Sequence, residues 1–235
     1  MATGQIKDLI YKVRLIISRM KEGIKVIVFD VGGVLQDERY SREQLRKKRL
    51  GVHNFMIKNL KIDLDSWMDS IDTAYSDSIK GLISEKEVVN KISKNLEISK
   101  EKLLKVFGKA YRHNFMKNKK LFALAHRLNG EGYMVGILSD QWHLSKKFLI
   151  PKNDTKGFYP VIVSCDVGLR KPDLRIYELL LKKVRNKDNK IKPSNILFVD
   201  NREWNLIPPR KLGMKTILFE NNKQLAKDLR ELHII

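Results

Sequence analysis

The sequence has little that is typical of a secreted or membrane-embedded protein. Cysteine occurs once, at Cys165, so no disulfide can form within the chain, and we expect a cytoplasmic, reducing location. No apolar run approaches the roughly 20 residues that a membrane span requires. The first residues do not show the charged, apolar and small-residue pattern of a signal peptide. Cys165 follows the apolar run 161–163, and we expect a packed thiol rather than a catalytic one.

Acidic residues are scarce relative to basic ones. The chain has 27 Asp and Glu against 47 Lys and Arg, which gives a formal net charge of +20. Such a surface attracts polyanions, including nucleic acids and phosphorylated ligands. The lysines are spread over the whole chain, however, and no zinc-finger or RRM signature is present. We therefore favour a small phosphorylated substrate over a specific nucleic-acid partner, and the sequence leaves the oligomeric state open.

The most informative stretch runs from Lys25 to Leu35. Its apolar run, Val26 to Phe29, predicts a strand that is buried on both faces, as in a parallel sheet. Asp30 ends the run, and two glycines follow almost at once. Open α/β sheets bind their ligands at such a strand end, so Asp30 is a candidate site residue. The alternative is that Asp30 only caps the following helix.

The rest of the chain predicts an α/β protein with an inserted helical segment. After Leu35 the pattern is polar and helical, with no strand-like run until about residue 118. From residue 118 onward, helices and strands alternate, which predicts a doubly wound, Rossmann-like parallel sheet. The expected helices cover 41–60, 63–80, 84–95, 99–116, 121–128, 144–149 and 172–184, and the expected strands cover 133–138, 161–163, 196–199 and 216–219.

This pattern divides the chain into three expected parts. Residues 1–23 contain an amphipathic basic helix over 5–22, which Gly23 ends. The α/β core is expected over 24–36 and 117–235, and a small α-helical cap over 37–116. A basic amphipathic helix can lie on a membrane or dock a partner, but packing on its own domain is the commoner outcome.

Three further segments accompany Asp30 in a fixed order. They are Gly136-Ile-Leu-Ser139-Asp140, Gly168-Leu-Arg-Lys171-Pro-Asp173 and Ile196-Leu-Phe-Val-Asp200-Asn201. Together with 25–35 they resemble the four motifs of the haloacid dehalogenase (HAD) superfamily of hydrolases. The resemblance covers about 25–219 and is nearest to subfamily I, in which a helical cap follows the first motif.

The resemblance implies a role for each matching residue. Asp30 would be the nucleophile that forms an aspartyl phosphate, with Ser139 and Lys171 as the other catalytic residues. Ser139, Asp140 and Lys171 would bind the phosphoryl group. A magnesium ion would be held by oxygens of Asp30, Gly32, Asp200 and Asn201. The implied function is a Mg²⁺-dependent phosphatase of small phosphorylated metabolites.

Gly32 departs from the pattern of many phosphatases in this superfamily. They carry a second Asp two residues after the nucleophile, which protonates the leaving group and then activates water. Glycine cannot do either, so we expect substrates with good leaving groups, such as anomeric sugar phosphates or acyl phosphates. Two alternatives remain: a catalytically degenerate HAD-fold protein that binds phosphate or RNA, and a 2-haloacid dehalogenase. Candidates for substrate contact from the cap and the loop after Ser139 are His53, Tyr75, His113, Gln141, Trp142 and His143.

Overall fold

A computed structural model describes residues 23–39, 43–44, 48 and 51–235 of the chain. The helix expected over 5–22 and part of the one expected over 41–60 lie outside the described residues. Among the helices that are described, none is both long and apolar enough to cross a lipid bilayer.

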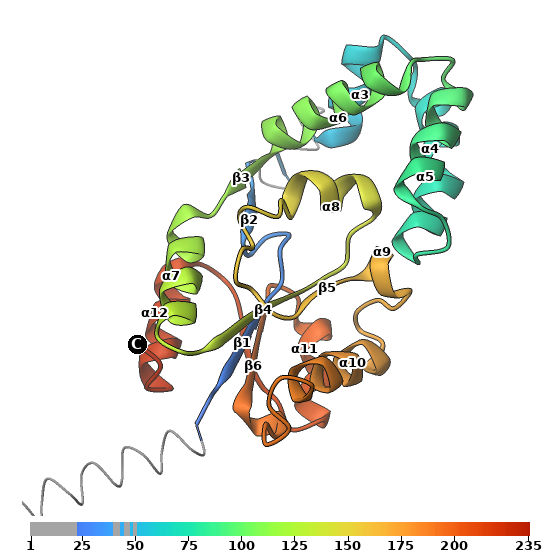
Figure 1. The fold of residues 1–235 in the computed structure, drawn as a ribbon. Helices are drawn as coiled ribbons and strands as arrows, with labels where there is room; N and C mark the ends of the chain where they lie inside the picture. Colours follow the sequence, from blue (N-terminus) through green and yellow to red (C-terminus); the bar gives the residue numbers. More distant parts are fainter. Residues whose placement is uncertain (1–22, 40–42, 45–47, 49–50) are drawn as a thin grey trace, which may run out of the picture.

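A parallel five-stranded sheet forms the centre of the protein, with β1 in the middle and the strand order β5-β4-β1-β6-β7 (Figure 1). Phe29 of β1 pairs with Ile137 of β4 on one side and with Val199 of β6 on the other. The predicted α/β fold with a doubly wound parallel sheet is confirmed. The strands are β1 (Val26–Phe29), β4 (Met134–Ser139), β5 (Val161–Val163), β6 (Ile196–Asp200) and β7 (Lys215–Leu218).

Helices cover both faces of the sheet, which explains the unbroken apolar run of β1. Ile27 and Phe29 pack on the side of α7 and α12, and Val26 and Val28 pack on the side of α10 and α11. All four side chains are fully buried. The helices around the sheet are α7 (Lys119–Gly130), α8 (His143–Leu149), α9 (Ser164–Val167), α10 (Leu174–Arg185), α11 (Glu203–Lys211) and α12 (Asn222–Glu231).

Four helices form a separate layer above the carboxyl ends of the strands (Figure 1). We call this layer the cap; it contains α3 (Val52–Leu60), α4 (Leu64–Ile79), α5 (Glu85–Asn95) and α6 (Lys100–Asn114). Ser84 and Glu87 form the capping box that their spacing predicts at the start of α5. Trp67 and Phe107 are fully buried at the centre of the cap, with their ring centroids 5.7 Å apart.

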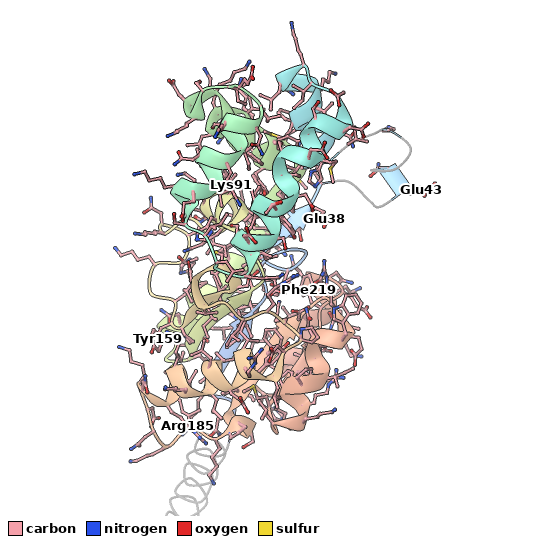
Figure 2. All side chains as sticks on the ribbon, turned by 90° about the vertical axis from the view of Figure 1, so that its right-hand side faces the viewer. Glu38, Glu43, Lys91, Tyr159, Arg185 and Phe219 are labelled. Atoms are coloured by element: carbon pink, nitrogen blue, oxygen red, sulfur yellow. The ribbon has the colours of Figure 1, made fainter. Side chains whose placement is uncertain are left out.

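A two-stranded antiparallel ribbon joins the cap to the sheet layer. It consists of β2 (Gln36–Glu38) and β3 (Phe115–Lys117), with Glu38 paired to Phe115. Figure 2 shows Glu38 between the cap, which carries Lys91, and the sheet layer, which carries Arg185. The expectation of a purely helical segment between 37 and 116 was wrong at these ends. Each strand has three residues, which is too short for alternation of apolar and polar residues to reveal it.

Candidate active site

Asp30 lies at the carboxyl end of the central strand. Its backbone N–H donates to the carbonyl oxygen of Val199 at 2.9 Å, which continues the ladder between β1 and β6 by one residue. The chain then turns sharply through Gly32 and Gly33, and the N–H of Gly33 donates to the carbonyl of Gln36 at 2.8 Å. Asp30 itself is buried beside this turn and is only 7% exposed.

A buried cation joins the two carboxylates that the sequence pattern predicts to be neighbours. Lys171 Nζ lies 2.9 Å from Asp30 Oδ1 and 2.6 Å from Asp200 Oδ2. The Lys171 side chain is 1% exposed and that of Asp200 is fully buried. Burial lowers the pKa of Lys171, but the two carboxylates raise it by more, so the net shift is upward. Lys171 is therefore a fixed positive charge between two anionic groups.

Asp200 is held in place by its own loop. Arg202 donates its backbone N–H to Asp200 Oδ1 at 2.8 Å, and Asn205 Nδ2 donates to both carboxylate oxygens, at 3.2 and 3.1 Å. Burial, and then repulsion from Asp30, raise the pKa of Asp200 against the opposing effect of Lys171. A further positive charge near Asp30 and Asp200 would therefore stabilise the ionised pair.

Ser139 and the two residues after it form the next part of the floor. Ser139 ends β4 beside Asp30 and is fully buried. Gln141 Nε2 donates to Ser139 Oγ at 3.2 Å, so the amide of Gln141 covers the serine hydroxyl. Asp140 turns the other way and accepts the backbone N–H of Lys171 at 3.0 Å. Asp140 thus positions the loop that carries Lys171, and its pKa is raised by burial.

Asn201 completes the floor beside Gly33. A Cβ on Gly33 would lie 3.1 Å from Asn201 Cγ, and Gly33 has a φ of +77°, which favours glycine. Asn201 Oδ1 is buried and has no hydrogen-bond partner in the described part of the chain. An unpartnered buried oxygen in the residue that follows Asp200 suits a hard cation, which prefers oxygen ligands. The residues present therefore fit a magnesium ion.

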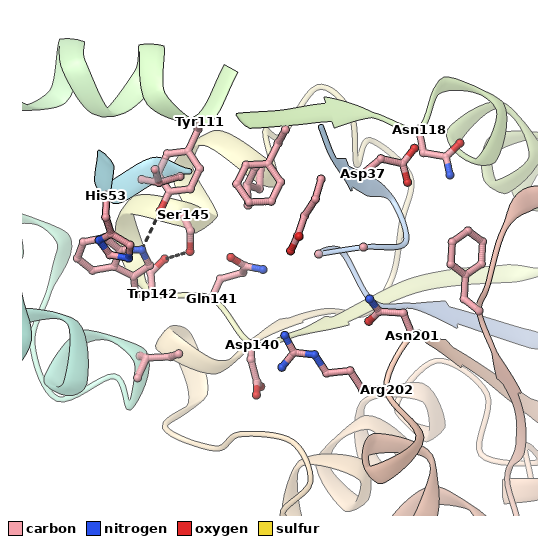
Figure 3. Close-up of a pocket in the computed structure, with 18 of the residues that line it drawn as sticks. Asp37, His53, Tyr111, Asn118, Asp140, Gln141, Trp142, Ser145, Asn201 and Arg202 are labelled. Carbon is pink, nitrogen blue, oxygen red and sulfur yellow. Dashed lines mark hydrogen bonds between the residues drawn. The ribbon is translucent and has the colours of Figure 1, made fainter. Parts of the chain in front are cut away.

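A cleft of about 1040 Å³ opens under the cap (Figure 3). Gly32, Gly33, Asp140 and Asn201 line it, whereas Asp30, Ser139, Lys171 and Asp200 are buried and do not. Figure 3 shows Asp140, Asn201 and Arg202 on the floor, facing Tyr111 and Trp142 on the other side. Trp142 Nε1 donates to the Tyr111 hydroxyl at 3.0 Å, so these polar groups satisfy each other. Among the described residues that line the cleft, the aromatic ones are His53, Trp67, Tyr75, Phe107, Tyr111, Phe115, Trp142, Trp204 and Phe219.

Comparison with proteins of known sequence gives partial matches. Bifunctional epoxide hydrolase 2 of Mus musculus is 27% identical over 177 residues, which is 73% of this chain and 29% of that protein. Flavin mononucleotide hydrolase 1 of Arabidopsis thaliana is 38% identical over 71 residues, which is 30% of this chain and 27% of that protein. The chain thus spans less than a third of these relatives. No family model matches it.

Comparison with solved structures covers most of the chain. A HAD-family enzyme of Bacteroides thetaiotaomicron superposes with a TM-score of 0.64 and 22% identity, over 87% of this chain and 98% of that one. A HAD-like hydrolase of Porphyromonas gingivalis gives a TM-score of 0.63 and 20% identity, over 89% and 98%. The chain has the HAD fold. The Bacteroides enzyme has also been crystallised with magnesium and inorganic phosphate.

The HAD fold brings the predicted site residues together at one edge of the sheet. Asp30 and Asp200 lie on adjacent strands, Ser139 on the third, and Lys171 enters from the loop before α10. Arg170, next to Lys171, points outward, with its side chain 45% exposed and its Nε 3.7 Å from Asp140 Oδ2. The catalytic, phosphate-binding and metal-binding roles of these residues remain predictions.

The cleft includes some of the predicted substrate contacts and not others. His53, Tyr75, Gln141 and Trp142 line it, whereas in the described part of the chain His113 and His143 do not. His143 Nδ1 lies 2.8 Å from Ser78 Oγ at the end of α4, and the ring of His113 packs 5.2 Å from that of Phe55.

Sequence reasoning missed several lining residues. Asp37 and Glu38 reach the cleft from β2, and Arg202 stands at its edge beside Trp204, at 5.7 Å from the ring centre. Arg202 could have been predicted from its position two residues after Asp200. The loop that follows a motif at a strand end faces the same cleft as the motif.

Proposed function

We propose that this chain is a Mg²⁺-dependent HAD-family hydrolase that releases phosphate from small phosphorylated metabolites. The supporting observation is the buried arrangement in which Lys171 Nζ stands between the carboxylates of Asp30 and Asp200. Two anions held together at the ends of parallel strands, with the unpartnered oxygen of Asn201 in the residue after Asp200, support a site for a hard cation and a phosphoryl group. The magnesium and phosphate found in the Bacteroides enzyme support the same assignment.

In the proposed reaction, an Asp30 carboxylate oxygen attacks phosphorus, and the bond from phosphorus to the leaving oxygen breaks. The leaving group departs with its electron pair, and water then cleaves the aspartyl phosphate to release inorganic phosphate. Lys171 neutralises negative charge on the transferring group, and Ser139 donates a hydrogen bond to one of its oxygens. The cation would be held by Asp30, Asp200, Asn201 and the carbonyl of Gly32, and it would supply charge neutralisation for two approaching anions.

Gly32 restricts the substrates that such a site can process. No side chain at this position can protonate the leaving oxygen. The side-chain atom nearest to where a Cβ on Gly32 would lie is Gln141 Nε2, at 4.0 Å. An amide can donate a hydrogen bond to the leaving oxygen, but it cannot transfer a proton. We therefore propose substrates whose leaving groups depart as stable anions, such as acyl or anomeric sugar phosphates.

A phosphatase panel tests the proposal. The purified chain is assayed with acyl, anomeric sugar and simple alkyl phosphates, with and without Mg²⁺, beside Asp30→Asn. We expect phosphate release that needs Mg²⁺, stops in EDTA and is lost in Asp30→Asn. Release of halide from a 2-haloacid that persists in EDTA would show the dehalogenase instead. Failure to hydrolyse any phosphate, together with salt-dependent binding of RNA, would show the degenerate binding protein.

A further inference from the structure

A second group of metal-binding side chains lies outside the candidate active site. It consists of His143 at the start of α8 and of Cys165 and Asp166 in α9. One ligand atom from each residue lies within 4.8 Å of the other two. Cys165 Sγ is 3.8 Å from Asp166 Oδ1. We propose that these residues bind a borderline-soft divalent cation, of which Zn²⁺ is the physiological example.

One ligand pair is already close to tetrahedral spacing, and the others, at no more than 4.8 Å, need a larger adjustment of the side chains. Zinc bonds of about 2.3 Å to sulfur and about 2.0 Å to nitrogen or oxygen place neighbouring ligand atoms roughly 3.3 to 3.6 Å apart. The 3.8 Å between Sγ and Oδ1 therefore needs to shrink by a few tenths of an ångström. Water would supply the fourth ligand, because Asp166 is exposed while Cys165 is buried. The nitrogen and sulfur donors set this group apart from the all-oxygen donors around Asp30, which suit magnesium.

The histidine is prepared for coordination. Its Nδ1 lies 2.8 Å from Ser78 Oγ, and its backbone N–H donates to the same oxygen at 3.0 Å. Zinc-bound histidines usually donate their second ring N–H to an outer partner, which fixes the ring and its tautomer. In the tautomer in which Nδ1–H donates to Ser78 Oγ, Nε2 carries the lone pair that the metal would use. Burial also lowers the pKa of His143, so the ring is neutral at pH 7, as a ligand must be.

Two features of the site limit its affinity. Lys146 Nζ pairs with Asp166 Oδ1 at 2.6 Å and must release it for the metal to bind. The Cys165 thiol is protonated near neutral pH, so coordination expels its proton to solvent as the sulfur–metal bond forms. Lys146 competes with the metal for Asp166, so removing its charge should strengthen metal binding. If the three side chains do not bind metal together, removing this charge should have no such effect.

The three proposed metal ligands lie where the cap packs on the sheet layer. Ser78 belongs to α4 of the cap, and His143 follows Ser139 by four residues. The loop after α4 packs tightly on α9, since a Cβ on Gly81 would lie 2.9 Å from the carbonyl oxygen of Cys165. A metal ion here would tie α9 to the start of α8, at the junction between the cap and the loop that follows Ser139.

Cobalt binding tests the proposal directly. Co²⁺ bound to a thiolate gives a charge-transfer band in the near ultraviolet, and Cys165 is the only cysteine of the chain, so such a band can come from no other residue. We expect a band that saturates at one Co²⁺ per chain and disappears when Zn²⁺ is added. It should persist in excess Mg²⁺ and in Asp30→Asn, which separates it from the candidate active site and from the proposed function.

Variants decide whether the three residues act together. We expect Cys165→Ser to abolish the band, and His143→Asn and Asp166→Asn to weaken Co²⁺ binding by about tenfold or more. Lys146→Gln should strengthen it several-fold. His233→Asn, an exposed histidine beyond α12, is the matched control and should change nothing. Circular dichroism checks the fold of each variant. If Cys165→Ser is unfolded, Co²⁺ binding by Asp166→Asn is the decisive test, because Asp166 is exposed.

The opposite results overturn the proposal. The absence of a band in the unmodified chain excludes the site. A band whose Co²⁺ affinity is unchanged in both His143→Asn and Asp166→Asn shows binding by the thiol alone.

Discussion

Gly33 and Asn201 lie so close together that a Cβ on Gly33 would force the Asn201 side chain to move. A Cβ on Gly33 would overlap Asn201 Nδ2 and lie 3.1 Å from Cγ, and the φ of Gly33 is +77°. This contact joins the turn after β1 to the loop after β6, close in sequence to both carboxylates of the candidate site, since Asp30 follows β1 directly and Asp200 ends β6.

Gly33→Ala should therefore destabilise the protein by about 2 to 3 kcal/mol, combining left-handed strain with a steric clash. Gly132→Ala is the matched control, because Gly132 has a φ of +97° with nothing within 4 Å of the added Cβ. It should cost only the strain, about 1 to 2 kcal/mol. Urea unfolding measures both. In the Asn201→Ala background, Gly33→Ala should lower the free energy of unfolding by less than it does in the native sequence. An unchanged loss would exclude the clash with Asn201 as its cause.

Gly32→Asp should give the site the proton donor that it lacks. The nearest atom to a Cβ at this position is 4.0 Å away, and the φ of Gly32 is not positive, so the side chain can be accommodated. If the chain is a phosphatase, turnover of alkyl phosphates should rise by about tenfold or more, since a positioned acid contributes on the order of 100-fold or more. Acyl phosphates should gain much less. Gly32→Asn, which has the same shape without a proton to transfer, should not show this gain.

Lys171→Met should remove the only group that neutralises Asp30 and Asp200 in the described structure. Breaking a buried charge pair by removing one partner costs about 3 to 5 kcal/mol, because the remaining charge is left uncompensated. Thermal unfolding without added metal measures this loss. Arg170→Met is the control, since Arg170 is partly exposed and lies 3.7 Å from its carboxylate, and it should cost less than about 1 kcal/mol. Similar losses in the two variants would contradict the central position given to Lys171.

Cys165 should make the stability of the protein decrease in alkaline solution. Burial, followed by the nearby charge of Asp166, raises the pKa of its thiol to about 11. The folded state therefore holds the thiol proton more tightly than the unfolded state, whose cysteine has a pKa of about 8.5. Its contribution to stability is complete below about pH 8.5 and is lost as the pH rises toward about 11. Urea unfolding at several pH values, with reductant and EDTA, should show a steeper decline for the native sequence than for Cys165→Ser. Parallel curves would exclude this assignment.

Much of the architecture could be predicted because its signals are local. The apolar run of β1 and the capping box of α5 each reflect physics that acts within a few neighbouring residues. The proximity of Asp30 and Asp200 followed from a simple rule, since parallel strands place their carboxyl ends at one edge of the sheet.

What the sequence did not reveal depends on distant partners or on weak local patterns. The helix α11 contains Pro208 and Pro209, which are typical of helix breaks, and the expected helices did not include it. The strands β2 and β3 form only because they pair with each other, although Glu38 and its partner Phe115 are 77 positions apart in the sequence. The amide of Gln141 over Ser139 likewise depends on side-chain placement that no periodicity predicts.

The pairing of Glu38 with Phe115 bears on whether the inserted segment can be exchanged for another. The inserted segment leaves and rejoins the sheet layer at two residues that sit opposite each other in one ribbon. A tight hairpin turn could bridge these two points without moving the sheet. The cap is therefore an exchangeable module: lids of other sizes could be grafted onto the same two strands, changing which molecules are admitted while the floor beneath stays as it is.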